Sequence, residues 1–292
     1  MYELIQISEH DYYINCPAKI GLEKNDAGEV IAIDSGSDKD TGKKVLRHIE
    51  ANGWHLKAIL NTHSHADHIG GNRLLQDRTG CAAYAPGLEN VYTNHPELEA
   101  MTLFGGYPLR ELQDKFLLAQ TSICQPLPDV LPDGLTAAYL PGHSFDMVGY
   151  RTADGNFYIG DSVSAEETLA KYGIGYLWDV EASLNTLKAL KETPAAHYIP
   201  AHAPVTEDIT GLADVNIRAI EDAAARIMDA CRQPVCFDDL LKAVFDGYGL
   251  TLNIQQYALI GSTLRSYLSW LCRQGRMGFM TVDNRLLWQT KE

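Results

Sequence analysis

One short stretch of the chain concentrates side chains that bind metal ions, and it determines the fold that we expect. It reads Asn61-Thr62-His63-Ser64-His65-Ala66-Asp67-His68-Ile69-Gly70-Gly71-Asn72. His63 and His65 are two positions apart, so both point to the same side of an extended segment. Asp67 and His68 follow where the chain is expected to turn into a helix, so they can face a second metal position nearby. We therefore expect metal ligands at the end of the apolar strand over residues 56–60.

The same arrangement recurs later in the chain, where an apolar strand leads to one residue of a metal-binding type. A single histidine after a strand is more often structural than a ligand. Side chains at the ends of adjacent strands can converge, however, and α/β folds commonly build sites in this way. We therefore group these residues with the first motif. The strands over residues 135–140, 157–159 and 198–200 lead to His143, Asp161 and His202.

These motifs resemble those of the metallo-β-lactamase-like hydrolases over roughly residues 1–209. The resemblance rests on HxHxDH at residues 63–68, Pro-Gly-His-Ser at 141–144, Gly-Asp at 160–161 and Ala-His at 201–202. It implies an α/β fold, a four-layer αββα sandwich with the metals at one edge of its two sheets. It also implies a first metal on His63, His65 and His143, a second on Asp67, His68 and His202, and a bridging Asp161.

The residue types constrain the chemistry that these ligands support. Neutral imidazole and carboxylate suit zinc, manganese or iron, and no cysteine in the motifs requires a thiophilic metal. We expect two divalent metal ions, with zinc as the first choice and iron or manganese as alternatives. A water that bridges two such ions becomes a hydroxide nucleophile near neutral pH and would attack an ester, a thioester or a related bond. Asp67 is the catalytic candidate, because it can bind a metal and orient this hydroxide.

Two residues in the motifs indicate which branch of the superfamily the chain resembles. β-Lactamases of this fold generally lack an aspartate at the bridging position, so Asp161 favours the glyoxalase II-like branch, whose substrates include thioesters. His65 argues against the flavin-linked diiron members, which usually have glutamate there. Residues 62–68 also resemble the opening motif of persulfide dioxygenases, which use one iron, and this is one alternative. The segment Ser162-Val163-Ser164 departs from the Arg-Thr-Asp pattern that those enzymes usually show after the aspartate.

The tail, residues 210–292, is expected to form a second domain that resembles a winged helix-turn-helix. Helices over residues 212–232 and 237–245 and two helical stretches between 254 and 273 precede a hairpin with a turn at Asp283-Asn284. Some superfamily members with such a tail are endoribonucleases, so an endoribonuclease or phosphodiesterase is the second alternative.

The charge of the tail does not favour a nucleic-acid partner. It carries nine basic and nine acidic side chains, without the basic stripe that phosphate binding usually needs. Arg265, Arg273 and Arg276 are its notable basic cluster, and 265 and 276 would share a face of one helix. We favour a small-molecule substrate, with the tail packed on the catalytic domain or forming a homodimer.

The other elements of residues 1–209 alternate between strands and helices. Helices are expected over residues 41–52, 67–78 and 180–192. The Pro- and Gly-rich segment 86–125 is expected to lie over the active edge. There we expect Tyr107 to line the pocket and Phe116 and Leu117 to pack in the core, whereas Tyr172 and Tyr176 are candidates for substrate contacts.

Composition indicates an ordinary soluble enzyme. The chain has 292 residues, a net charge of −14 and no apolar run long enough to cross a membrane. Its six cysteines are scattered, which is typical of reduced thiols. The first residues show no secretory signal, so we expect a cytoplasmic protein without a membrane partner.

Overall fold

The sheet that carries the first motif is built from the N-terminal part of the chain. The computed structural model describes residues 2–291 and places here β1 (Glu3–Gln6), β2 (Asp11–Asn15), β3 (Ile20–Lys24), β4 (Glu29–Ile33), β5 (His55–Leu60), β6 (Ala82–Ala85) and β7 (Cys124–Pro126). The strands lie side by side in this order, antiparallel from β1 to β4 and parallel from β4 to β7. The apolar run of β4 suits a central strand, because both faces of this sheet are covered.

The second sheet carries the three later motifs. It contains β8 (Thr136–Tyr139), β9 (Val148–Arg151), β10 (Phe157–Ser164) and β11 (Tyr198–His202), in the order β11-β10-β9-β8. Only β10 and β11 are parallel. The strand expected to end at residue 159 runs on to Ser164, so Asp161 lies inside β10 and not after it. The register of β10 against β11 shifts on both sides of Gly160, and this irregularity accompanies Asp161 at the sheet edge.

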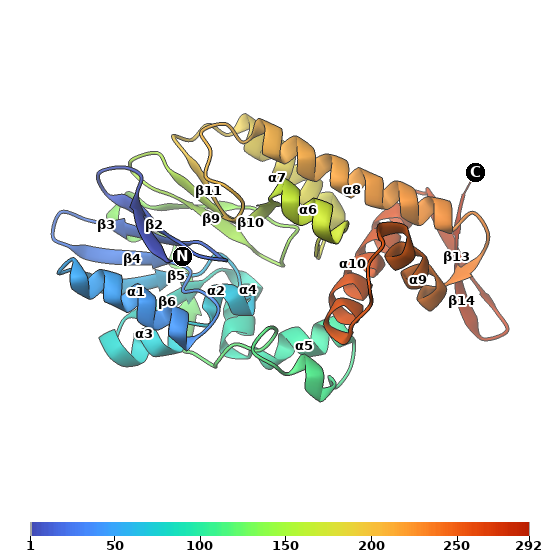
Figure 1. Ribbon diagram of the computed structural model, residues 1–292, viewed down its shortest axis with the longest axis horizontal. Coiled ribbons are helices and arrows are strands. Elements are labelled where there is room, and N and C mark those ends of the chain that lie inside the picture. Colours follow the sequence, from blue (N-terminus) through green and yellow to red (C-terminus); the bar gives the residue numbers. More distant parts are fainter. Residues whose placement is uncertain (1, 292) are drawn as a thin grey trace.

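Helices cover the outer faces of both sheets, which confirms the αββα sandwich. The helices α1 (Lys39–Ala51) and α3 (Asn72–Thr79) pack on the first sheet, and α7 (Val180–Glu192) and α8 (Thr210–Ala230) on the second (Figure 1). Ile33, Leu60, Tyr150 and Tyr158 fill the space between the sheets. The helix predicted over residues 180–192 is confirmed, and the Asp179 carboxylate accepts a hydrogen bond at its start.

The first motif does not continue into a single helix. The predicted helix over residues 67–78 is divided into α2 (Ala66–Ile69) and α3, with Gly70 and Gly71 between them. A Cβ atom on Gly70 would lie 2.3 Å from the backbone of Ser37, and one on Gly71 would lie 2.3 Å from the carbonyl oxygen of Ser35. The chain can therefore pass here only with glycine.

The segment over residues 86–125 forms a helical insertion at the edge of the sandwich. It contains α4 (Gly87–Asn94), α5 (Glu97–Phe104) and the short 3-10 helix η1 (Arg110–Leu112). A second 3-10 turn, η2 (Pro132–Gly134), precedes β8, and α6 (Glu166–Tyr172) follows β10. Figure 1 shows α5 below the sandwich, close to the C-terminal helices.

The tail packs helices against a small sheet. It contains β12 (Val235–Cys236), α9 (Phe237–Tyr248), α10 (Ile254–Arg273), β13 (Met277–Val282) and β14 (Arg285–Thr290), with the strand order β12-β14-β13. Asp283 and Asn284 have φ angles of 50° and 61°, as a tight hairpin turn requires. One continuous helix, α10, replaces the two predicted stretches, and Arg276 lies beyond its end. The resemblance to a winged helix stays a prediction.

The tail shares its core with the sandwich. One cluster of buried apolar side chains extends from β10 through α7 and α8 into α9 and α10, and it includes Phe157, Leu187, Ile220 and Leu264. Figure 1 shows α8 spanning from the sandwich to the tail. The division of the chain after residue 209 stays a prediction. Within residues 2–291 every helix is too short or too polar to cross a bilayer.

Candidate metal centre

Three histidines form the first ligand group at one edge of the two sheets. His63 and His65 follow β5, and His143 comes from the loop between β8 and β9. The Nδ1 atom of His65 lies 3.1 Å from His63 Nε2 and 3.0 Å from His143 Nε2. Three nitrogen atoms from two distant parts of the sequence thus lie close together.

A second ligand group lies beside the first. Asp67 and His68 belong to α2, and His202 is the last residue of β11. The Oδ2 atom of Asp67 lies 3.1 Å from His202 Nε2, and its Oδ1 atom lies 3.9 Å from His68 Nε2. The short helix therefore supplies two of the three members of this group.

Asp161 stands between the two groups. Its Oδ2 atom lies 3.4 Å from His143 Nε2 and 3.4 Å from His202 Nε2, which belong to different groups. Its Oδ1 atom lies 3.2 Å from His68 Nε2. The sequence-predicted ligands are all brought together, and this carboxylate has the position expected of a bridge.

The two groups fit metal ions. The potential ligand atoms within each group lie within 4.8 Å of one another. Ligands held about 2.0–2.2 Å from a tetrahedral zinc ion are about 3.4 Å apart, which is close to the distances found here. In the described chain, His68 Nε2 and Asp161 Oδ1 lie 3.2 Å apart without the alignment of a hydrogen bond, and both are buried without another hydrogen-bond partner. Buried polar atoms seldom lack a partner, and a cation between them would provide the missing interaction.

Asp34 orients ligands from both groups, and sequence reasoning missed it. Its carboxylate accepts hydrogen bonds from the backbone N–H and the hydroxyl of Thr62, both at 2.8 Å. It also accepts a hydrogen bond from His68 Nδ1 at 2.8 Å. The Thr62 hydroxyl oxygen lies 3.0 Å from His63 Nδ1 and can accept a hydrogen bond from it. Both imidazoles are thereby held with Nε2 toward the centre, as metal-binding histidines require.

The remaining imidazoles are oriented by other groups. The Nδ1 atom of His202 donates to the carbonyl oxygen of Pro17 at 2.8 Å, which leaves Nε2 for the centre. His65 Nε2 lies 4.0 Å from Glu99 Oε1. Burial raises the pKa of Glu99 well above its usual value. The ring of Tyr176 stands 5.4 Å from the ring of His65 and 5.6 Å from that of His143.

Glu89 connects the loops that carry the first group, and it too was missed. One oxygen of this fully buried carboxylate accepts hydrogen bonds from the backbone N–H and the hydroxyl of Ser64. The other oxygen accepts hydrogen bonds from the Ser144 hydroxyl and the Asp146 N–H. Ser64 adjoins His63 and His65, and Ser144 adjoins His143. Glu89 therefore fixes the distance between the two loops.

Burial prepares the first group for a metal ion. It lowers the pKa of His65 and that of His143 to about 4 each, and it lowers the pKa of His63 well below its usual value. These imidazoles are therefore neutral at physiological pH, which is the form that binds metal.

The second group is dominated by carboxylates. Asp161 is the main cause that raises the pKa of His202 to about 10. Burial would lower the pKa of His68, but Asp161, Asp67 and Asp34 together hold it well above its usual value. Burial would likewise raise the pKa of Asp161, yet His202 and His68 hold it well below. Without metal, His68 and His202 are therefore protonated, and a cation that binds to them would displace these protons.

His197, the histidine that immediately precedes β11, lies outside both groups. Its Nδ1 atom is 2.8 Å from Asn156 Oδ1, and its Nε2 atom is 3.6 Å from Glu207 Oε1. The predicted places of Tyr107 and Phe116 are both wrong. Tyr107 is 81% exposed, whereas Phe116 lines two cavities next to the centre.

The two cavities beside the centre differ in character. The polar hollow, of about 310 Å³, is lined by Asp38, Asp67, Glu99, Lys115 and several apolar residues. The apolar cleft, of about 630 Å³, begins at His202 and lies between α6 and α10. Tyr172 and Tyr176 both line it, so they are placed as their candidate role in substrate contacts requires.

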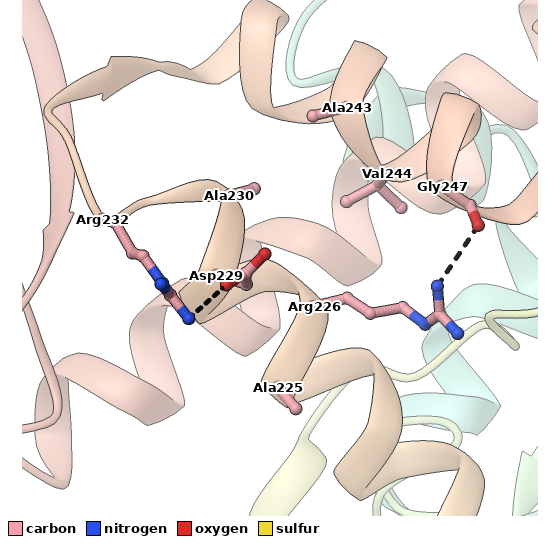
Figure 2. Close-up of a pocket in the computed structure, with 8 residues that line it drawn as sticks. All are labelled: Ala225, Arg226, Asp229, Ala230, Arg232, Ala243, Val244 and Gly247. Atoms are coloured by element: carbon pink, nitrogen blue, oxygen red, sulfur yellow. Dashed lines mark hydrogen bonds and ion pairs between the residues drawn. The ribbon is translucent and has the colours of Figure 1, made fainter.

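A third hollow lies in the tail, away from the centre. Figure 2 shows this cavity of about 620 Å³ between α8 and α9. Its two arginines are already paired: Arg232 with Asp229 at 2.7 Å, and Arg226 with Asp222 at 2.7 Å and with the Gly247 carbonyl. It presents small side chains and neutralised charges, and none of the metal-ligand candidates lies in its lining.

Proteins of similar sequence share the motif region. The hydroxyacylglutathione hydrolase of Thiobacillus denitrificans is 30% identical over 178 residues, which cover 58% of this chain and 55% of that protein. The lactamase-like protein adaB of Aspergillus niger is 27% identical over 182 residues, which cover 61% of this chain and 48% of that protein. The chain thus spans about half the length of the curated relatives it matches.

Solved structures and a family model extend the comparison. A beta-lactamase domain protein from Burkholderia ambifaria has a TM-score of 0.75 at 17% identity, covering 99% of this chain and 94% of its own. A metallo-beta-lactamase family protein from Thermus thermophilus has a TM-score of 0.72 at 16% identity, covering 99% of this chain and 97% of its own. These structures share the fold. The model of the metallo-beta-lactamase superfamily matches residues 22–202, more than half of the 292 residues, and the chain belongs to this superfamily.

Proposed function

We propose that this chain is a hydrolase that uses two divalent metal ions to cleave an ester, a thioester or a related bond. The observation that carries the proposal is Asp161, whose carboxylate oxygens face both ligand groups. When bound, the ions would supply a hydroxide nucleophile near neutral pH and polarise the scissile carbonyl group. Zinc is the first choice, and the same ligands accept iron or manganese. Relatives named hydroxyacylglutathione hydrolase favour a thioester, because hydroxyacylglutathione is one.

The residues of the chain hold and orient the reactants. Asp34 and Glu89 fix the imidazoles, so little reorganisation is needed when substrate binds. Asp67 lines the polar hollow, and its Oδ1 atom is 3.9 Å from the nitrogen of His68. We propose that this oxygen would accept a hydrogen bond from the attacking water and direct it at the substrate.

Neither alternative function gains support from the tail or the ligand groups. The guanidinium of Arg265 lies 3.9 Å from the centre of the Phe237 ring, and Arg273 faces Asp179 at 3.8 Å. Arg276 lies beyond α10. Two of the three arginines of this cluster are therefore engaged by neighbouring side chains. A dioxygenase with one iron would leave the second group unused, although Asp161 faces both groups.

A pair of histidine variants tests the proposal. His202→Ala removes a ligand of the second group, and His197→Ala removes a histidine of the same strand region outside the site. We expect His202→Ala to lower kcat/KM for an activated thioester at least about 100-fold, because losing a ligand costs no less than losing its orienting partner. His197→Ala should retain activity. Equal activity of both variants would contradict the assignment.

A further inference from the structure

The apolar cleft opens directly beside the second ligand group. Its lining starts at His202 and continues along α6 to Tyr172 and Tyr176. The opposite wall is formed by the N-terminal part of α10, with Leu259 and Ile260. Phe116, from the insertion, closes one end. A chain that leaves the metal centre on the His202 side therefore enters this cleft.

The described residues that line the cleft carry no charge apart from that of His202. Its polar members are neutral hydroxyl and amide side chains: Ser164, Thr168, Asn253, Gln255 and Gln256. The ammonium group of Lys171 lies over the ring of Tyr172 at 4.7 Å, outside the lining. An anionic group bound in the cleft would lose water without gaining a partner, and this is costly.

The polar hollow adjoins the cleft, since Phe116, Tyr176 and Leu259 line both, and it differs from the cleft in carrying charged side chains. It contains Glu99 and Lys115, and the Lys115 ammonium lies 3.3 Å from the Asp38 carboxylate. Charged and hydrogen-bonding groups of a substrate find partners there. Charged side chains beside the centre thus lie in the polar hollow, and the lining of the cleft offers an apolar part of the substrate a separate place next to His202.

We infer that the apolar cleft binds the acyl group of the substrate, and that this group is uncharged, apolar and several carbon atoms long. The inference rests on the proposed hydrolase function and names its substrate class. A volume of about 630 Å³ is in the range of cavities that enclose small organic ligands, about 300–1,000 Å³. Phe116 and Tyr172 are 58% and 41% exposed, and an acyl chain would cover both. Hydrolysis joins the oxygen of water to the acyl carbon as the carbon–sulfur bond breaks, giving a carboxylic acid and a thiol.

Gln256 adds a polar feature to the cleft. Its amide oxygen is buried without a hydrogen-bond partner in the described part of the chain. A buried acceptor of this kind is stabilised when a ligand brings a donor. An acyl chain that carries a hydroxyl or an amide N–H can provide one without introducing a charge.

Thioesters of one neutral thiol test the inference, because the leaving group and the metal chemistry then stay constant. The metal-loaded full-length protein is assayed with acyl groups from acetyl to decanoyl, and with succinyl and adipoyl as the charged counterparts of butanoyl and hexanoyl. We expect kcat/KM to rise about fourfold per added CH₂ until the cleft is filled. Each carboxylate-ended substrate should be at least about tenfold poorer than its neutral counterpart.

Two matched variants connect this preference to the cleft. Tyr172→Arg places a cation in the lining, and Tyr107→Arg makes the same change at an exposed tyrosine outside the lining. Both side chains are exposed, so both variants should fold. We expect Tyr172→Arg to improve adipoyl relative to hexanoyl about two- to fivefold, as exposed ion pairs do. Tyr107→Arg should leave this ratio unchanged.

The outcomes separate the inference from the function on which it rests. If the metal-loaded protein hydrolyses none of the thioesters, the proposed function fails and the inference fails with it. If it hydrolyses them without regard to acyl length, or prefers the carboxylate-ended set, the hydrolase function stands and the inference is overturned. A change of the adipoyl-to-hexanoyl ratio in Tyr107→Arg alone would also overturn it.

Discussion

At the scale of single residues, the ligands could be predicted from the sequence, but the residues that orient them were overlooked. His63, His143 and Asp161 follow or interrupt apolar strands, and this local pattern identified them. Asp34 follows the apolar strand β4 in the same way and was not recognised. Its φ of 65° is unusual for a residue other than glycine and marks a constrained position. Glu89 left no local signal, because its hydrogen-bond partners Ser64 and Ser144 are distant in the sequence.

Glu89 is expected to control the affinity of the first ligand group. In Glu89→Gln an amide N–H₂ faces hydroxyl and backbone donors, so the two loops separate. We expect metal affinity to fall about 10–100-fold, as for other groups that orient ligands. Competition with a chromophoric chelator measures this. Glu97→Gln, at a half-exposed residue of α5, is the control and should bind metal as the unaltered chain does. Equal affinities would contradict the role of Glu89.

Metal binding by the second group should release protons. The pKa of His202 is raised to about 10 and that of His68 is raised as well, so both are protonated in the metal-free protein near pH 7–8. Both must lose a proton before they can ligate, so affinity should increase as the pH rises toward about 10. Calorimetric titrations in buffers of different ionisation enthalpy count the released protons. A heat of binding that is independent of the buffer would show this expectation to be wrong.

At the scale of elements, long periodic segments were predictable and their interruptions were not. The helix α7 was predicted with its observed bounds, because its apolar spacing is regular and Asp179 caps it. The break between α2 and α3 arises from the approach of Ser35 and Ser37, which are remote in sequence. Conversely, Gly261 near the middle of α10 does not end that helix, because Ala258 and Leu264 on either side of it are buried. Tertiary contacts decide these cases, and a local pattern does not contain them.

Gly70 is expected to set the position of α2 and therefore of its two ligands. In Gly70→Ala the new Cβ would approach the backbone of Ser37, which cannot yield without moving the chain. We expect a loss of about 1–3 kcal/mol in the free energy of unfolding, measured with urea, together with weaker metal binding. Gly211→Ala, in a helix with open space around it, should be neutral or stabilise by up to about 1 kcal/mol. If Gly70→Ala and Gly211→Ala had similar free energies of unfolding, the role assigned to Gly70 would be contradicted.

At the scale of the whole molecule, the tail completes the surroundings of the centre. Residues of α10 line the apolar cleft and pack against the insertion, so segments far apart in sequence enclose the same space. The sequence could indicate that the tail is helical, but not that Leu259 lies near His202. The reason is that helical periodicity identifies a buried face and not its partner. The predictions for Phe116 and Tyr107 were wrong for the same reason.

The central claim is that one chain binds two divalent metal ions that Asp161 bridges. Elemental analysis of protein expressed without added metal tests it most directly. We predict close to two equivalents of zinc, manganese or iron per chain, and a loss of metal in Asp161→Ala with the fold retained. Close to one equivalent of iron, with His202 dispensable for binding it, would contradict the claim and favour the dioxygenase.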